Sequence, residues 1–440
     1  MRLRPPAIIV LIVLALLVCS HSARGITING RCYPQPVFLG LNDGQSPRAS
    51  QANIGWVRTG VYWRDIQTGP TTWNWTPPDG IVNYYYNSGV KILWILSGAP
   101  VWAGSNSTGT VPVDIGLWQA FVQQMAARYA GKIAAYEIWN EPDLTNNGGT
   151  GVGWDGPLYS LPAYGDYVRV AAQAIRANAP GTLVVAPAMS SCTARSGDVW
   201  RSLENYQMTG GTASQYIDVV SFHANANPNS PGTPQWVWTN DILNQMTSIR
   251  NNNPSDLNKP VWVTEFGWPS GKVGEQYQAN DIQYIMQQLT RYFCELCYPS
   301  YCDYNYFPKY SVGFIYHGID GSGDTQGIFR SNGTPKLVVT SYTTSLPRVG
   351  VQPPASGSYT APWTAASISC VGRTCTFTSG YPDQSTGGLH ELFDWDFGDG
   401  TSGTSHTTTH TYSGPGTFFV FHGAMWGIQL WTDARILRVP

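Results

Sequence analysis

Eight short apolar runs alternate with longer amphipathic segments between Gly25 and Leu346, and this alternation restricts the fold more than any other feature of the chain. Most of the runs are apolar throughout, which is typical of parallel β-strands that are covered on both faces. The runs lie at Val37–Leu41, Gly55–Gly60, Lys91–Leu96, Ala134–Trp139, Thr182–Ala186, Val219–Phe222, Val261–Thr264 and Val312–Tyr316. They predict eight parallel strands.

The segments between the strands have helical periodicity, most clearly in Asp114–Tyr129, Ala163–Asn178 and Glu275–Phe293. In the first of these, apolar side chains recur at helical spacing: Leu117, Phe121, Val122, Met125 and Tyr129. Eight βα units in residues 25–346 predict an α/β fold of the (β/α)8 TIM-barrel type, with any chemistry at the carboxyl ends of the strands. A doubly wound open sheet is the alternative that the same pattern allows.

Residues 1–23 have the pattern of a signal peptide, because Arg2 and Arg4 precede an apolar run, Ala7–Val18, and a short polar stretch follows. That run is too short to span a bilayer, which takes about 20 residues, and no later stretch offers a transmembrane anchor. We therefore expect a secreted protein, extracellular or periplasmic. Lipid attachment at Cys19 is the alternative, although Val18 stands where such signals usually have Gly or Ala.

The charge balance and the aromatic content narrow the class of partner. The chain has 25 Lys and Arg against 27 Asp and Glu, a net charge of −2, which argues against nucleic acid or an anionic membrane because both attract a basic face. Charged residues make up only 12 % of the chain, whereas aromatic residues make up 13 %. Because aromatic rings can stack on the C–H faces of sugars, the composition favours uncharged ligands.

Export permits disulfides, and Cys370 and Cys375 flank a turn-like segment that favours a disulfide across a hairpin. Three further cysteines lie close together in the sequence: Cys294, Cys297 and Cys302. They favour a disulfide within the cluster, with zinc as the alternative, although a fourth metal ligand is missing nearby. We expect no metal, and an odd number of cysteines after removal of the signal peptide leaves one thiol without a partner in the chain.

Two glutamates follow apolar runs at positions where a barrel would expose them on one face. Glu141 lies in Trp-Asn-Glu-Pro after the fourth run, and Glu265 lies in Thr-Glu-Phe-Gly-Trp after the seventh. In a closed barrel these strand ends face each other across the mouth, so the two carboxyl groups can flank one glycosidic bond. Either glutamate alone could be a surface charge or a helix cap, but the pair predicts retaining glycoside hydrolysis.

With these motifs the chain resembles the clan A glycoside hydrolases, (β/α)8 retaining enzymes that include the family 5 and family 39 groups. The resemblance implies that Glu141 is the acid/base and Glu265 the nucleophile, and that no cofactor is required. It further implies that Asn140 binds the sugar 2-hydroxyl and that Arg58, at the end of the second strand, orients the nucleophile. A structural ion pair of Arg58 with Glu137 is the alternative.

Other positions at the strand ends are candidate sugar-binding residues: His223, Trp102, Trp268, Tyr316 and His317. His223 matches the histidine that the family has on strand six, but Asn225 stands where a tyrosine is frequent. Strand eight lacks the family's tryptophan, so Tyr316 or His317 would replace it. Trp102 and Trp268 could be sugar platforms or packing residues. The Gly-rich segment Gly321–Gly327 is expected to form a loop over the barrel mouth.

The end of the chain differs from the rest. Residues 347–362 are rich in Pro, Gly and Ser and are typical of a linker, and residues 363–440 contain short β-type runs. Within them Trp-Asp-Phe-Gly-Asp-Gly, Trp395–Gly400, resembles the signature of PKD domains, which implies a small immunoglobulin-like β-sandwich. Such a domain could contact a polysaccharide or another protein. Calcium is not expected, because Gly398 stands at a required ligand position.

The sequence lacks the motifs of other chemistries, since it has neither a Gly-x-Ser-x-Gly elbow at a strand end nor a phosphate-binding loop. The whole pattern therefore predicts a secreted retaining glycoside hydrolase that cleaves an oligo- or polysaccharide by double displacement. A catalytically silent carbohydrate-binding protein on the same barrel and a transglycosylase are the alternatives.

Overall fold

The computed structural model describes residues 26–28, 31–33, 37–42, 48–52, 54–103, 114–141, 161–188, 190, 213–225, 231–245, 259–295, 311–342, 358–360, 366–380, 391–426 and 429–440. The chain divides into two compact units, one of residues 38–286 and 311–348 and the other of residues 1–37, 287–310 and 349–440. The signal-peptide segment, most of the linker and three of the cysteines, Cys192, Cys297 and Cys302, lie outside the described residues. The domain boundaries drawn from the sequence stay predictions.

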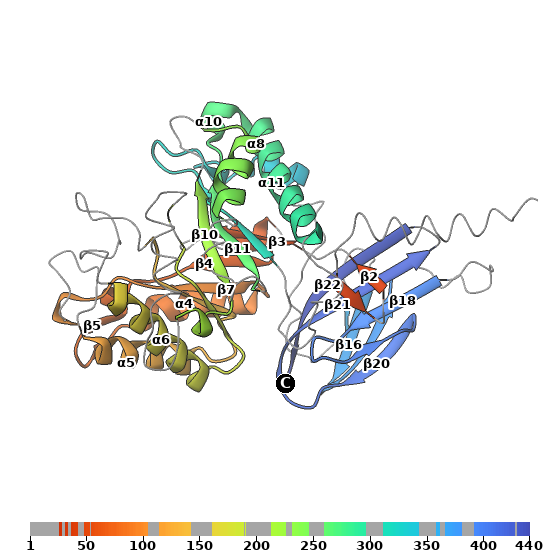
Figure 1. Cartoon of the computed structure of the whole chain (residues 1–440), viewed down its shortest axis with the longest axis horizontal. Helices are drawn as coiled ribbons and strands as arrows, with labels where there is room; N and C mark the ends of the chain where they lie inside the picture. The colour runs from red at the N-terminus through yellow and green to blue at the C-terminus, as the bar shows by residue number, and fades with distance from the viewer. Residues whose placement is uncertain are drawn as a thin grey trace, which may run out of the picture. The chain divides into compact units, whose positions relative to one another are not determined.

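The first unit is built on an eight-stranded parallel sheet (Figure 1). Its strands are β3 (Val37–Asn42), β4 (Trp56–Thr59), β7 (Lys91–Leu96), β8 (Ala135–Ile138), β9 (Leu183–Val185), β10 (Val220–Asn225), β11 (Val261–Gly267) and β12 (Ser311–Ile315). Neighbouring strands follow one another in chain order, β12 pairs with β3, and a parallel bridge between Val185 and Val219 links β9 to the start of β10. The prediction of a (β/α)8 barrel is therefore confirmed, as are all eight strands.

Helices lie between the strands, and the longer ones match the predicted segments. They are α2 (Arg48–Gln51), α3 (Trp63–Ile66), α4 (Thr76–Asn87), η1 (Val101–Ala103), α5 (Ile115–Arg128), α6 (Leu161–Asn178), η3 (Ala213–Tyr216), α8 (Pro234–Trp236), η4 (Val237–Leu243), α10 (Ser270–Val273), α11 (Glu275–Glu295) and η6 (Val338–Tyr342). The Asp114 side chain caps α5 by accepting hydrogen bonds from the next turn. The buried face of α5 includes Trp118 rather than Leu117, which is exposed.

Large aromatic side chains fill the barrel interior. Trp56 and Trp262 are fully buried and meet edge to face, with ring centroids 4.9 Å apart. Phe314 packs so closely on Gly40 that a Cβ there would lie 2.3 Å from the phenyl ring. The glycine is therefore required by this packing, and the interior is a solid core that leaves chemistry to the strand ends.

Two small sheets extend the barrel. β5 (Gln67–Gly69) and β6 (Thr72–Trp73) form a hairpin after the second barrel strand, and β13 (His317–Ile319) pairs with β14 (Gly327–Phe329) directly after the last one. The Gly-rich segment predicted as a loop joins β13 to β14. No helix among the described residues is both long and apolar enough to cross a membrane.

The second unit contains two four-stranded antiparallel sheets and a two-stranded sheet of β1 (Ile26–Ile28) and β2 (Arg31–Tyr33). One large sheet has β15 (Ser358–Thr360), β16 (Ala366–Val371), β17 (Thr374–Ser379) and β20 (Thr407–Thr411). The other has β18 (Glu391–Asp396), β19 (Ser402–Gly403), β21 (Gly416–Trp426) and β22 (Gln429–Val439). Buried residues of both sheets, Phe377 and Trp395 among them, form one core, which confirms the predicted β-sandwich.

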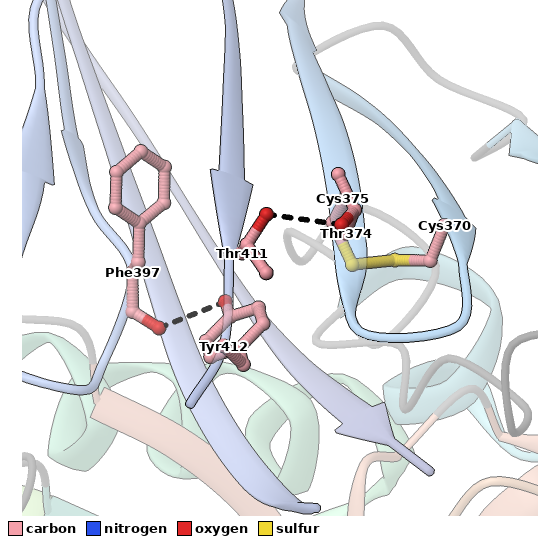
Figure 2. Close-up of a disulfide and its surroundings, with 6 residues drawn as sticks. All are labelled: Cys370, Thr374, Cys375, Phe397, Thr411 and Tyr412. Carbon is pink, nitrogen blue, oxygen red and sulfur yellow. Dashed lines mark hydrogen bonds between the residues drawn. A yellow bond between two sulfur atoms is a disulfide. The ribbon is translucent and has the colours of Figure 1, made fainter. Parts of the chain in front are cut away.

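The predicted disulfide joins Cys370 to Cys375 across the β16–β17 hairpin (Figure 2). On the core side, the Tyr412 hydroxyl donates a hydrogen bond of 3.0 Å to the Phe397 carbonyl oxygen. Both contacts fix the end of the sandwich that carries the Trp-Asp-Phe-Gly-Asp-Gly segment.

Candidate active site

Glu141 lies just past β8 in an unusual backbone conformation. Trp139 has a φ of 77° and Glu141 a φ of 45°, both in the left-handed region that side chains other than glycine rarely adopt. Each such residue costs about 1–3 kcal/mol and persists only where its surroundings hold it. Here the Trp139 amide donates to the Leu96 carbonyl, and the Glu141 amide donates to the Ala188 carbonyl. Neighbouring strands thus hold Glu141 at the barrel mouth.

Glu265 lies within β11, near its carboxyl end. The register between β10 and β11 shifts between Phe222 and His223, so that His223 pairs with Glu265, and the pairing of β11 with β12 also shifts beyond Val263. Such irregularities redirect side chains at the rim of a sheet. The acidic side chain is therefore placed beside His223 at the same end of the barrel as Glu141.

The two predicted catalytic carboxyl groups lie close together. One oxygen of Glu141, one oxygen of Glu265 and a ring nitrogen of His223 all lie within 4.8 Å of one another. The Glu141 side chain is 18 % exposed and that of Glu265 12 % exposed. Burial raises the pKa of Glu141 above its ordinary value, although the nearby Arg58 charge opposes part of this effect. A partly buried pair of this kind suits one acid and one carboxylate.

Arg58 on β4 contacts two glutamates, Glu137 on β8 and Glu265 on β11. Its Nε lies 2.6 Å from Glu137, and its Nη1 lies 2.6 Å from Glu265. Nη1 also donates to Asn42 and Nη2 donates to Asn140, at 2.8 and 2.5 Å. Burial alone would lower the pKa of Arg58, but the carboxylates of Glu137 and Glu265 outweigh it and raise the pKa. The predicted contact with the nucleophile and the alternative ion pair are both present.

His223 bridges the two carboxyl groups. Its ring is fully buried, and Nδ1 lies 2.8 Å from Glu141 Oε1 and 3.4 Å from Glu265 Oε2. Gln245, on the helical segment after β10, donates a hydrogen bond of 2.8 Å to the His223 carbonyl and so holds its backbone. The ring thus offers one nitrogen to both carboxyl groups.

The two candidate tryptophans differ in accessibility. Trp102 in η1 is half-buried, donates to the Gln67 carbonyl and meets Trp63 edge to face. Trp268 is fully buried and donates to the Gly232 carbonyl. Because a sugar cannot stack on a ring with no exposed face, Trp268 is a packing residue here rather than a platform.

Tyr316 and His317 follow the last barrel strand. Their rings stack with centroids 4.1 Å apart, and His317 Nδ1 lies 2.8 Å from Asp324. Burial, followed by the negative charge of Glu265, raises the pKa of Tyr316, so its hydroxyl stays protonated. Tyr316 is half-buried, and its backbone amide donates a hydrogen bond of 2.8 Å to the carbonyl of Phe266, the residue that follows Glu265. The structure therefore brings Tyr316 to the site.

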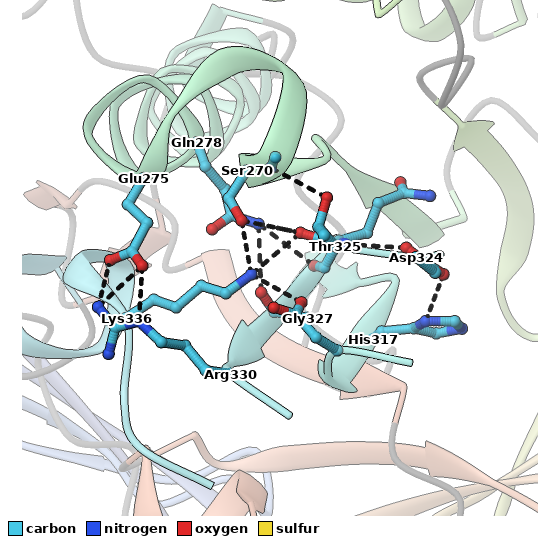
Figure 3. A network of polar contacts seen from close by, with 12 residues as sticks. Ser270, Glu275, Gln278, His317, Asp324, Thr325, Gly327, Arg330 and Lys336 are labelled. Carbon is cyan, nitrogen blue, oxygen red and sulfur yellow. Dashed lines mark hydrogen bonds and ion pairs between the residues drawn. The ribbon is translucent and has the colours of Figure 1, made fainter. Parts of the chain in front are cut away.

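A polar network fixes the segment that carries these two rings (Figure 3). The ammonium group of Lys336, whose side chain is 1 % exposed, contacts Asp320 and the Ser270 hydroxyl, each at 2.7 Å, and the Thr325 carbonyl at 3.0 Å. Ser270 begins α10, shortly after the strand that bears Glu265. The network thus connects the β13–β14 segment to the start of α10, shortly after β11, and fixes the position of this segment.

Sequence reasoning missed two residues that support the site. Asn42 at the end of β3 accepts from Arg58 on the second strand and donates to the carbonyls of Thr264 and Ile315, so it also joins the first strand to the seventh and eighth. A polar residue ending an apolar run was its only signal. Gln245 lies in a helix distant in sequence from His223 and carries no signal at all.

The cluster of Glu141, His223 and Glu265 is also a set of atoms that a cation could bind. Arg58 already neutralises one oxygen of Glu265 at 2.6 Å, so a cation would share that carboxylate with a guanidinium. The arrangement of charges therefore suits organic acid/base chemistry better than metal binding, and the expectation of no metal stays a prediction.

A (β/α)8 barrel with two carboxyl groups at its mouth defines the class of glycoside hydrolases with a clan A fold. Residues 46–302 match the family model of cellulase, glycosyl hydrolase family 5, and residues 359–421 match that of the PKD domain. The chain therefore belongs to the cellulase family, glycosyl hydrolase family 5, and carries a PKD domain that follows the barrel in the sequence.

Solved structures show the same fold at low sequence identity. A family 39 glycoside hydrolase from Bacteroides cellulosilyticus WH2 is 14 % identical with a TM-score of 0.50, over 82 % of this chain and 75 % of that one. A glucosidase from Croceicoccus marinus is 11 % identical with a TM-score of 0.52, over 89 % of this chain and 95 % of that one. No curated protein sequence matches the chain significantly.

Proposed function

We propose that the protein is a retaining glycoside hydrolase that cleaves O-glycosidic bonds of an oligo- or polysaccharide by double displacement. The observation that carries the proposal is the approach of Glu141 and Glu265 oxygens to within 4.8 Å. Retaining enzymes hold their carboxyl groups about 5–5.5 Å apart, whereas inverting enzymes need about 6.5–9.5 Å to admit a water molecule. The spacing here supports direct attack by a carboxylate.

In the first step, a Glu265 oxygen attacks the anomeric carbon as the bond to the leaving oxygen breaks. Glu141 donates its proton to that oxygen, so a free hydroxyl leaves and a glycosyl ester remains on Glu265. Burial supports this role for Glu141, since its raised pKa keeps the proton available. Arg58 at 2.6 Å supports the complementary role of Glu265, because the guanidinium holds one carboxylate oxygen in place.

In the second step, Glu141 removes a proton from water, which attacks the anomeric carbon and releases Glu265. Esterification has removed the negative charge of Glu265, and this loss favours ionisation of Glu141. His223 Nδ1, 2.8 Å from Glu141, can stabilise the carboxylate that forms. Asn140 accepts from Arg58 through its oxygen, which leaves its amide nitrogen as the donor for a sugar 2-hydroxyl.

The sugar would lie against the aromatic rings that remain accessible. Tyr316 supports this because it is half-buried and close to Glu265, and His317 extends its stack. Trp102 could contact a more distant sugar unit through its exposed edge.

We further propose that the protein is exported, because residues 1–23 have the pattern of a signal peptide. N-terminal sequencing of the mature chain tests this; an intact Met1 after secretion-competent expression contradicts it.

The stereochemistry of the first product tests the mechanism. Aryl glycosides of several sugars are screened, and the anomeric proton of the product of the best substrate is followed by NMR at early times. Retention of the anomeric configuration is expected. Inversion would show that water attacks directly and that Glu265 is not the nucleophile.

A further inference from the structure

One face of the PKD domain carries a regular array of hydroxyl groups. Strands β16, β17 and β20 pair in register, and their outward side chains form three rows across three strands. The rows are Ser367–Thr378–Thr407, Ser369–Thr376–Thr409 and Val371–Thr374–Thr411. We call these nine residues the threonine face. Eight of the nine carry a hydroxyl group.

The threonine face is open, and the opposite face of the same strands is closed. Seven of its residues are exposed, and Ser367 and Thr378 are half-buried. The alternate residues Ile368, Cys375 and Phe377 are almost completely buried in the sandwich core. The backbone is therefore held rigidly from behind, and the outward side chains are displayed on a fixed lattice.

Threonine has a high β-propensity, and this alone explains single threonines on an exposed strand. It does not explain the absence of charge from all nine positions. β20 is the end strand of this sheet in the part of the chain that the structure describes. End strands of a sheet usually carry charged residues that prevent association with other chains. β20 has the sequence Thr-Thr-Thr-His-Thr and carries no Lys, Arg, Asp or Glu, so both this strand and the threonine face are without that protection.

The hydroxyl groups of the threonine face indicate which kind of ligand it can bind. Each threonine hydroxyl is both a donor and an acceptor, and rows of them are spaced by the strand separation of about 4.8 Å. Thr374 and Thr411 hydrogen-bond to each other at 2.9 Å, as Figure 2 shows, and Thr407 donates to Thr378 at 3.4 Å. These mutual bonds restrain the rotamers, so less entropy is lost on binding.

We propose that the threonine face binds the surface of an uncharged, insoluble polysaccharide. A polysaccharide surface repeats donor and acceptor hydroxyls on a flat lattice and has no charge, which complements a flat face of uncharged hydroxyls. The choice of ligand rests on the proposed hydrolysis of sugars by the barrel. Each contact is weak, but a domain that holds the enzyme on its substrate raises the local concentration of the barrel.

The test compares retention of the full chain on microcrystalline cellulose, chitin, insoluble xylan and insoluble mannan. All variants carry Glu265→Gln so that the polysaccharide is not degraded. Ser369→Lys with Thr409→Lys places long charged side chains on the face, and we expect retention to be lost. Thr376→Val with Thr409→Val keeps the shape but removes two hydroxyls, and the partition constant should fall about tenfold.

The matched control is Thr71→Lys with Thr404→Lys, which adds the same charge at exposed positions outside the nine residues of the face and should bind like the parent. Binding should be insensitive to salt, because no charge takes part. Equal retention of the parent and the Ser369/Thr409 variant on all four materials would overturn the proposal. A dimer of the parent that the Thr409→Lys change dissociates would overturn it as well, because the face would then bind a second copy of the chain.

With Glu265 restored, the Ser369/Thr409 variant should hydrolyse a soluble aryl glycoside at the parent rate. The two proposals therefore fail separately. Retention that depends on the face without any hydrolysis would contradict the enzymatic proposal alone, and hydrolysis without retention would contradict the binding proposal alone.

Discussion

The barrel mouth and the threonine face use polar side chains in opposite ways. At the mouth, Arg58, Glu137 and His223 are almost completely buried, and the backbone around Glu141 is strained. On the threonine face, the hydroxyls are exposed, uncharged and attached to regular strands. The mouth holds charges out of water, where electrostatic interactions are stronger than in solvent. The face keeps its groups in water, where they are easily available to a large surface.

This difference indicates which substitutions should affect stability and activity most. Buried charges depend on their partners, so a single substitution at the mouth should be costly. Exposed groups on a packed sheet are nearly independent, so substitutions there should change binding and little else. The following changes, from the largest expected effect to the smallest, can break or sharpen this contrast.

Replacing Glu265 by Gln should have the largest effect. The amide cannot attack the anomeric carbon, so kcat/KM on the best aryl glycoside should fall by a factor on the order of 10⁵. The matched control is Glu275→Gln, which changes a glutamate that pairs with Arg330 outside the site and should keep activity. Comparable losses of kcat/KM in both variants would show that replacing any buried or paired glutamate impairs the protein. They would therefore contradict a specific role for Glu265.

Replacing Glu141 by Ala should have an effect that depends on the leaving group. Hydrolysis of a natural glycoside should fall by about 10²–10⁴, the usual contribution of an acid/base group. A glycoside with an activated leaving group needs no proton, so its cleavage should be largely spared, and added azide should restore turnover as a glycosyl azide. Hydrolysis of the natural glycoside at the parent rate would exclude the assigned role.

The pH profile sharpens the same assignment. Because burial raises the pKa of Glu141, its protonated form persists to higher pH than in an ordinary glutamate. We expect kcat/KM to decline on the alkaline side as this proton is lost, above the usual titration range of a glutamate. In Glu141→Gln, measured with an activated substrate, that alkaline decline should disappear. A decline that persists unchanged would assign it to another group.

The cost of unpaired charge can be measured on two arginines. Arg58→Met leaves Glu137 and Glu265 without their cation, and the free energy of unfolding should fall by about 3–5 kcal/mol. Arg128→Met removes an exposed ion pair with Asp79 and should cost about 1 kcal/mol or less. Equal losses in denaturant unfolding would contradict the contrast between buried and exposed charge.

The smallest expected effect on activity concerns the sandwich. Cys370→Ser with Cys375→Ser opens a disulfide that closes a very short loop, so the PKD domain should lose about 2 kcal/mol of stability. Hydrolysis of a soluble glycoside should be unchanged, because the disulfide lies outside the catalytic barrel. A fall in activity at temperatures where the PKD domain is still folded would contradict this separation.

Much of the fold could be predicted because its signals are local. Parallel strands buried on both faces read as continuous apolar runs, and all eight were found; the Cys370–Cys375 pair was found because a turn lies between the two residues. The proximity of Glu141 and Glu265 could be predicted because the strand ends of a barrel converge, whereas their catalytic roles stay a prediction. For Trp268 the sequence left a sugar platform and a packing residue both open, because sequence does not tell which face of a strand-end aromatic is covered, and the structure shows the ring buried.

The supporting residues could not be predicted because their partners are distant in sequence. Asn42 joins three strands only after the barrel has closed, and Gln245 reaches the His223 carbonyl from a helix. Glu137 gave a partial signal, as a charge within an apolar strand. The threonine face has a signal in its alternating threonines, but only the register of three strands shows that they form one lattice.

A mechanism-based 2-deoxy-2-fluoro glycoside tests the central claim most directly, since it forms the glycosyl ester but releases it slowly. Digestion and mass spectrometry of the treated protein should find one added sugar on the peptide that contains Glu265, and none in Glu265→Gln. Two results would contradict the account. One is a sugar attached to Glu141 or to any other residue of an active preparation. The other is rapid hydrolysis of the inhibitor with no adduct.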